Sequence, residues 1–200
     1  MLATMRARIS NEVDCGECAA RGRCWPGESI AGAGFLVRRA RRVPAGEPVF
    51  EQGSPFDAPC IVTDGCIALI EILRDGDERI VAFRVPGEIV GLESLNRKTH
   101  RYGARAVTES ALCRLRWNPG HGGGTRNSAL LRALLGKAVS QSAESTLPWP
   151  GLPAVERVRA FLADFHERSG RSPPLTRAQI GQYLGLAEET VVRAMKALAR

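Results

Sequence analysis

Glycines at turn positions recur at nearly constant intervals in the first half of the sequence. They are Gly53, Gly65, Gly76 and Gly87. A spacing of 11 or 12 residues is typical of all-β sandwiches and rolls. The pairs Asp64-Gly65 and Asp75-Gly76 predict hairpins, because glycine accepts the positive φ of tight primed turns. Residues 66–73 and 80–85 are rich in β-branched and aromatic side chains, so an antiparallel β-roll is predicted over 35–117.

The last part of the chain has helical periodicity instead. Apolar residues predict an amphipathic helix over 154–168. Thr176 is a suitable N-cap for a helix over 177–184, and the turn Gly185-Leu186 precedes a final helix over 187–199. A helix, a short glycine-containing turn and a second helix form the helix-turn-helix pattern. The predicted fold class is therefore α+β.

A leucine-rich segment between these regions predicts a long helix from Asn127 or Ser128 to about Leu147. Its apolar positions are Leu130, Leu131, Leu134, Leu135, Ala138 and Val139. They follow helical spacing, and the stripe is wider than one contact face needs. An ordinary core helix and a dimer seam explain it equally well. The following Pro148-Trp149-Pro150 predicts the end of the helix.

Three cysteines lie close together near the N-terminus, in a segment without the apolar periodicity that would explain their burial. They are Cys15, Cys18 and Cys24. Thiolates on a loop can wrap an iron–sulfur cluster, zinc or copper(I). Three ligands leave one position open, for which Cys60, Cys66 and Cys113 remain. Cys60 and Cys66 stand in strand-like sequence and are interpreted as small buried hydrophobic residues.

Composition and charge restrict the class of protein. The first 14 residues lack a signal-peptide core, and the apolar runs are too short to span a bilayer, so a cytoplasmic location without a membrane partner is expected. The net charge of +7 fits a nucleic-acid partner, although the basic run over 38–42 is interpreted as a solvated face. None of the three histidines has a persuasive catalytic partner in the sequence, so an enzyme is not expected.

The final helix carries a second chemical motif. Val191, Met195 and Leu198 are predicted to point inward, which leaves Glu189 and Arg193 on the other side. Arg can bind guanine O6 and N7, and Glu can accept from cytosine N4, so the two suit a G·C pair. The alternative is a surface ion pair. Within a helix-turn-helix, DNA recognition is the favoured interpretation.

These parts, in this order, resemble the fumarate and nitrate reduction regulator (FNR), a branch of the cyclic-AMP receptor protein (CRP) superfamily. The N-terminal Cys-x2-Cys-x5-Cys is similar to the spacing that FNR proteins use for three ligands of an oxygen-labile [4Fe–4S] cluster. Residues 75–83 and 86–92 also resemble the family. The stretch over 106–113 is similar to the family's late β-roll segment, which makes Cys113 the implied fourth ligand.

The resemblance implies a domain organisation and a function. The implied regions are a cysteine-rich cluster-binding segment (1–34), an antiparallel β-roll sensor domain (35–118), a connector with a long dimerisation helix (119–150) and a helix-turn-helix DNA-binding domain (151–200). The implied function is an oxygen-responsive, and by extension nitric-oxide-responsive, transcription regulator of the activator type. It would act as a homodimer with RNA polymerase, on an inverted repeat with half-sites resembling TTGAT or TTGAC.

The resemblance also implies roles for individual residues. The implied DNA-binding residues are Thr176, Glu188, Glu189, Thr190, Val192, Arg193 and Lys196. FNR proteins usually carry serine where Val192 stands, and valine can touch a thymine methyl but cannot hydrogen-bond. Glu144 falls where the family has an acidic residue that opposes dimerisation until the cluster is in place. It joins the apolar stripe in the implied dimerisation set.

The sequence departs from the family in several places, among them a Gly-rich loop over 120–124 in place of a short helix and a dimerisation helix shortened by residues 148–150. It ends at Arg200, with the recognition helix, so the wing hairpin is missing and a reduced affinity for DNA is expected. The cyclic-nucleotide cassette lacks its Arg-Ser pair where Arg101-Tyr102 stands, so cyclic AMP is not an expected ligand. Two alternatives stay open: a zinc- or thiol-redox-dependent regulator of the same fold, and a shortened family member that pairs with intact ones.

Overall fold

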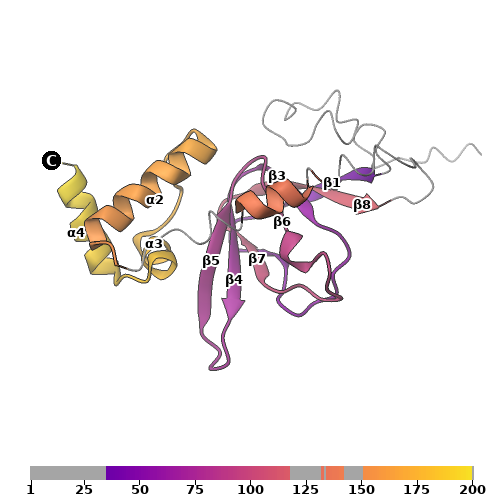
Figure 1. The fold of residues 1–200 in the computed structure, drawn as a ribbon, viewed down its shortest axis with the longest axis horizontal. Helices are drawn as coiled ribbons and strands as arrows, with labels where there is room; N and C mark the ends of the chain where they lie inside the picture. The colour runs from indigo at the N-terminus through magenta and orange to yellow at the C-terminus, as the bar shows by residue number, and fades with distance from the viewer. Residues whose placement is uncertain (1–34, 118–131, 133, 142–150, 200) are drawn as a thin grey trace, which may run out of the picture.

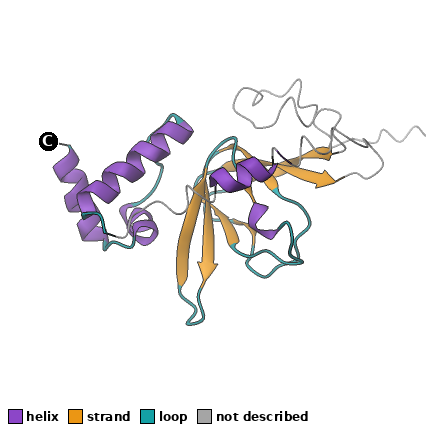
Figure 2. Cartoon of the chain, in the orientation of Figure 1, coloured by secondary structure: helices purple, strands orange, loops and turns teal. Residues whose placement is uncertain are grey.

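The computed structural model describes residues 35–117, 132, 134–141 and 151–199. A β-roll leads into a short helical stretch over 134–141 and then into three further helices that lie together on one side of the roll (Figure 1). Figure 2 shows that the strands and the three C-terminal helices are segregated along the chain, as the α+β prediction requires. The predicted fold class is confirmed.

Two antiparallel four-stranded sheets build the roll. The strands are β1 (Phe35–Val43), β2 (Pro48–Phe50), β3 (Cys60–Asp64), β4 (Ile67–Ile72), β5 (Glu78–Arg84), β6 (Ile89–Val90), β7 (Gly103–Ala106) and β8 (Ser110–Trp117), with a 3-10 turn, η1 (Leu92–Ser94), after β6. One sheet has the order β1-β8-β3-β6 and the other β2-β7-β4-β5. Their facing sides enclose a core that includes Cys60, Val62, Leu69 and Leu112. β3 and β4 are buried in continuous runs rather than in alternation, and on β4 the face away from this core is covered by the helices.

The two predicted hairpins have different outcomes. Asp75-Gly76 connects β4 to β5, which pair directly, and Gly76 has a φ of 91°. Asp64-Gly65 connects β3 to β4, which belong to different sheets, so that hairpin prediction is wrong. Gly65 still needs its φ of 83°, because the chain turns a corner against β8. A Cβ added there would lie 2.3 Å from Ser110 Oγ and 2.5 Å from the Glu109 carbonyl oxygen.

The three C-terminal helices pack on the outer side of β4 and β5. They are α2 (Ala154–Ser169), α3 (Arg177–Leu184) and α4 (Glu188–Leu198). One apolar cluster joins them to the sheet: Phe83 of β5 lies 6.1 Å from Phe161 of α2 and 5.3 Å from Tyr183 of α3, between ring centroids. Phe161 is fully buried. The helical region and the roll therefore share a core.

A buried ion pair joins the same two regions. Arg168 of α2 donates to Glu88, in the turn after β5, at 2.9 and 3.1 Å, and it also contacts Asp164 at 3.0 Å. The Glu88 side chain is 5% exposed and that of Arg168 is 13% exposed. Burial alone would lower the pKa of Arg168, but Glu88 and Asp164 more than offset this effect and raise it, so the group stays charged. Removing one partner from such a buried pair costs about 3–5 kcal/mol.

Substituting alanine for Gly65 should destabilise the fold more than the same change at Gly76. Both glycines have positive φ, but a Cβ at Gly76 meets no atom within 4 Å, whereas at Gly65 it meets the backbone of β8. Gly76→Ala should therefore lower the free energy of unfolding only through backbone strain at positive φ, by about 1 kcal/mol or more. We expect Gly65→Ala to lose at least about 1 kcal/mol beyond that. Urea unfolding of both variants measures the difference, and equal losses would contradict the corner assignment.

Candidate functional site

The helix-turn-helix is formed by α3 and α4. Thr176 begins α3 with a capping box: its hydroxyl accepts from the Gln179 N–H at 3.1 Å, and the Gln179 side chain accepts from the Thr176 N–H at 2.9 Å. The predicted cap is confirmed, and the Thr176 O–H remains available to donate to a phosphate. Gly185, with a φ of 66°, ends α3 before α4 begins.

The two faces of α4 are sorted as the sequence predicts. Val191 is buried, with Ala194 beside it, and Met195 and Leu198 pack against the same core. The opposite face is exposed and carries Glu188, Glu189, Arg193 and Lys196. Thr190 and Val192 are half-buried at the border.

The exposed face of α4 has the chemistry of a base-reading surface. Arg193 Nη2 lies 3.4 Å from Thr190 Oγ1, so the guanidinium is held along the helix toward the N-terminal end that carries Glu189. The helix N-terminus is the end that enters a major groove in helix-turn-helix proteins. Arg193 can there donate to two acceptors of one base. The arrangement therefore presents the predicted pair to solvent in an accessible form.

The candidate metal ligands are only partly within the described residues. Cys15, Cys18 and Cys24 lie outside them. Cys113 lies on β8, directly opposite Ile61 of β3 and Arg39 of β1. No group of three potential metal ligands occurs within residues 35–117, 134–141 and 151–199.

Cys113 faces away from the core between the sheets. Its neighbour Leu112 belongs to that core, so strand alternation places Cys113 on the outer face, where it is 6% exposed. The strand opposite, β1, continues directly from the segment that contains the other three cysteines. Four thiolates are the donor set that a [4Fe–4S] cluster needs. The donor chemistry and this strand pairing fit a ligand role for Cys113.

Cys60 and Cys66 are buried in apolar clusters, as predicted from the sequence. Cys60 lies in the core between the sheets and Cys66 in the core shared with the helices. Burial raises the pKa of the Cys60 thiol, an effect that Arg114 partly opposes, and burial raises the pKa of Cys66 to about 12. Neutral thiols are poor metal ligands. The geometry separates these two residues from Cys113.

The leucine-rich helix divides its predicted stripe between two environments. Leu130, Leu131 and Glu144 lie outside the described residues. Leu134 is 5% exposed and packs within its own chain, whereas Leu135 is 61% exposed and Val139 is 69% exposed. Ala138 is half-buried between them. One face of the stripe is therefore core, as the first interpretation predicts, and the other presents apolar side chains to solvent; the dimer seam stays a prediction.

A structural contact that the sequence interpretation missed is made by Gln141. It is 2% exposed, accepts from the Ile89 N–H at 3.4 Å and donates to the Ile89 carbonyl oxygen at 3.0 Å. Ile89 is on β6, the edge strand of its sheet, so the side-chain amide takes the place of a further strand. Gln141 lies seven residues after Leu134 on the same helical face. A polar residue on an apolar face was the signal available in the sequence.

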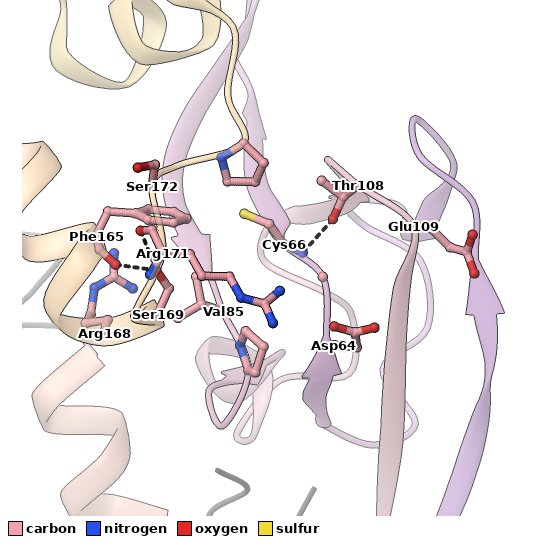
Figure 3. Close-up of a pocket in the computed structure, with 13 residues that line it drawn as sticks. Asp64, Cys66, Val85, Thr108, Glu109, Phe165, Arg168, Ser169, Arg171 and Ser172 are labelled. Atoms are coloured by element: carbon pink, nitrogen blue, oxygen red, sulfur yellow. Dashed lines mark hydrogen bonds between the residues drawn. The ribbon is translucent and has the colours of Figure 1, made fainter.

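Two cavities lie where the roll meets the helices. The larger, about 410 Å³, lies between the roll and α2, with Cys66 and Thr108 on one wall and Phe165 and Ser169 on the other (Figure 3). Its rim carries both acidic and basic side chains, so it has no clear charge preference. The smaller, about 330 Å³, lies between the roll and helical residues 138–141. It contains buried Arg84, whose Nε has no hydrogen-bond partner and whose Nη2 lies 3.7 Å from Glu93.

The same two regions match known protein families. Residues 40–118 match the cyclic nucleotide-binding domain, and residues 156–200 match the Crp-like helix-turn-helix domain. Among the described residues, no helix is both long enough and apolar enough to cross a membrane.

Similar proteins support one family assignment. The transcriptional activator protein Anr of Pseudomonas aeruginosa is 28% identical over an alignment of 208 positions, which spans 96% of this chain and 85% of Anr. The nitrogen fixation regulation protein FixK of Rhizobium meliloti is 33% identical over 161 residues, covering 76% of this chain and 72% of FixK. The structure of FixK2 from Bradyrhizobium japonicum aligns with a TM-score of 0.62 at 27% identity, over 80% of this chain and 84% of that one.

These relatives are transcription regulators rather than enzymes, as the sequence predicts. The resemblance drawn from the cysteine spacing and the helix-turn-helix is thereby confirmed at the level of the family. The chain belongs to the FNR branch of the CRP superfamily of transcription regulators.

Proposed function

We propose that the chain is an oxygen-responsive transcription regulator, in which a [4Fe–4S] cluster controls the binding of a homodimer to inverted-repeat DNA. The exposed face of α4 carries this proposal, because Glu189, Arg193 and Lys196 stand clear of the core on a helix-turn-helix. The role as an activator is carried over from relatives such as the transcriptional activator protein Anr, and RNA polymerase is proposed as the partner that activation would require. Nitric oxide is a second candidate signal, since it attacks the same kind of centre.

The proposed division of labour follows the chain. Residues 1–34 bind the metal centre together with Cys113, and residues 35–118 form the sensor roll. Residues 119–150 form the connector and dimerisation helix, and residues 151–200 read DNA. Cys15, Cys18, Cys24 and Cys113 would hold the cluster. When bound, it would supply an oxygen-labile link between the N-terminal segment and β8.

The dimer seam is proposed to use the exposed face of the leucine-rich helix. Leu135 and Val139 are one helical turn apart and are both more than half exposed. Burying such side chains against a partner helix stabilises association by up to about 1.5–3 kcal/mol each. Leu130, Leu131 and Ala138 are proposed to extend the seam, and Glu144 to oppose association until the metal centre forms.

DNA reading is proposed to follow from two-fold symmetry. A dimer sets two α4 helices about 34 Å apart, one turn of DNA, which matches an inverted repeat. Glu189 and Arg193 read a G·C pair, and Val192 contacts a thymine methyl. The remaining residues proposed for this interface are Glu188, Thr190 and Lys196 of α4 and Thr176, the N-cap of α3.

Cyclic AMP is not proposed as the ligand of the smaller cavity. The Glu93 carboxylate lines that cavity beside Arg84, so a negative charge already lies next to the buried guanidinium. A phosphate entering there would meet this carboxylate as well as Arg84. Arg101 also lines this cavity, so its cationic side chains outnumber the Glu93 carboxylate, and cyclic AMP is set aside because the sequence lacks the Arg-Ser pair of the cassette.

Metal and sulfide analysis after anaerobic purification tests the sensor assignment. We expect a brown protein with about four iron and four acid-labile sulfide per chain. Cys113→Ala should lose the cluster, because a thiolate ligand is removed. Cys60→Ala is the matched control, since Cys60 is an equally buried thiol that faces the core between the sheets, and it should keep the parent's iron content.

Two results would contradict this assignment. A colourless parent protein with stoichiometric zinc would replace the cluster by a structural zinc site. A full cluster in Cys113→Ala would show that another residue is the fourth ligand.

Substitution of the α4 residues tests the DNA interface. Arg193→Ala should weaken binding to the inverted repeat by about 30- to 20,000-fold, the equivalent of about 2–6 kcal/mol, because the dimer loses one bidentate base contact of about 1–3 kcal/mol in each half-site. It should also relax the preference for G·C at one position of each half-site. Lys196→Ala should instead weaken binding to all sequences and reduce the salt dependence. Competition titrations with permuted duplexes measure both effects, and unchanged base preference in Arg193→Ala would refute the base-reading role.

A further inference from the structure

One short turn of the roll is hydrogen-bonded to the neighbouring strand β3. This junction turn, residues 85–89, follows β5 and enters β6. The Glu88 N–H donates to the Val85 carbonyl oxygen at 3.0 Å, and Glu88 Oε2 accepts from the Val85 N–H at 3.2 Å. Val62 of β3 exchanges backbone hydrogen bonds of 2.8 Å with Gly87 and Glu88. The turn therefore behaves as a rigid unit.

Two neighbouring residues of the junction turn are bound by two different parts of the chain. Glu88 binds Arg168, near the C-terminal end of α2. The next residue, Ile89, has both backbone polar groups bound by Gln141 of the leucine-rich helix. Consecutive Cα atoms are about 3.8 Å apart, so the two attachments are separated by one peptide unit.

Arg168 constrains the geometry of this contact, because a guanidinium donates to several acceptors in fixed directions. It donates to Glu88, to Asp164 of its own helix and to the Phe83 carbonyl oxygen at 3.3 Å. These contacts fix the direction of α2 relative to β5. The Gln182 side chain adds a contact from α3 to the Glu78 carbonyl oxygen. Glu189 and Arg193 are exposed in this arrangement. The packing of α2 and α3 against the roll therefore orients the recognition helix α4 without covering its polar face.

We propose that the junction turn couples the leucine-rich helix to the DNA-reading domain, with Gln141, Glu88 and Arg168 as positioning residues. Displacement of the helix at Gln141 shifts Ile89, and the rigid turn transmits the shift through Glu88 to Arg168 and α2. The position of the leucine-rich helix thereby sets how firmly α2 to α4 are docked. The inference rests on the proposed DNA-reading role of α4 but not on the identity of the metal centre.

Hydrogen–deuterium exchange of the full chain without DNA tests the transmission. Gln141→Met keeps the length of the side chain and removes both hydrogen bonds to Ile89. We expect exchange to become at least about fivefold faster not only over 85–89, where Gln141 binds Ile89, but also over 164–169 on α2. Ser140→Ala, at the exposed neighbouring position of the same helix, should match the parent. Acceleration confined to 85–89, or none at all, would overturn the proposal.

DNA titration supplies a second arm with charge-matched variants. Arg168→Lys keeps the net charge but cannot hold Glu88 and Asp164 together, and we expect about a tenfold loss of affinity for the inverted repeat. Arg159→Lys, in the exposed pair with Glu156 on the same helix, should stay within about twofold of the parent.

The double variant distinguishes coupling from two separate effects. The double variant, Gln141→Met with Arg168→Lys, should bind the inverted repeat with about the affinity of the weaker-binding single variant, because both substitutions interrupt the same coupling. A loss equal to the product of the two single-variant losses, or parental affinity in Arg168→Lys, would overturn the coupling. If the parent itself does not select the repeat, the proposed DNA-reading function fails, whereas the exchange arm still decides the coupling.

Discussion

The buried ion pair between Glu88 and Arg168 is the constraint on which the arrangement of the two regions depends. Both side chains are largely buried, where an unpaired charge is costly. Arg168 bonds Glu88 of the roll and Asp164 of its own helix together, and this network fixes α2 against the end of β5. The aromatic contacts of Phe83 with Phe161 and Tyr183 follow from that alignment. Hydrophobic packing alone is non-directional, so the ion pair supplies the orientation.

Much of the fold could be read from local sequence signals. Gly76 marks a true hairpin, Thr176 caps α3, and the apolar spacing of α4 separates Val191 from Arg193 correctly. Each of these features depends on residues within one or two turns of one another. Local geometry and periodicity then suffice.

The features that the sequence could not reveal involve distant partners. Asp64-Gly65 has the composition of a hairpin, yet β3 and β4 enter different sheets, because strand pairing is decided by the whole roll. Leu134 and Leu135 are adjacent leucines with opposite environments. Glu88 and Arg168 are 80 residues apart, and neither stands out in its own segment. Gln141 left only a weak sign, a polar residue on an apolar face.

The candidate site shows the same division. The α4 face was predictable, because its chemistry and its periodicity lie in one helix. For Cys113, the sequence indicated the residue only through a family resemblance. Its outward orientation follows from its alternation with the core residue Leu112 on β8, and its position opposite β1 follows from the pairing of β8 with β1 and β3. That orientation distinguishes it from Cys60 and Cys66, whose burial in apolar clusters is purely structural.

The most direct test of the central claim is the affinity of one anaerobic preparation for an inverted-repeat duplex, measured before and after exposure to air. Fluorescence anisotropy at fixed salt, with a scrambled duplex as competitor, isolates specific binding from charge-driven association. The account predicts at least about a 100-fold loss of specific affinity in air, together with dissociation of the dimer. Equal specific affinity in both states would contradict it.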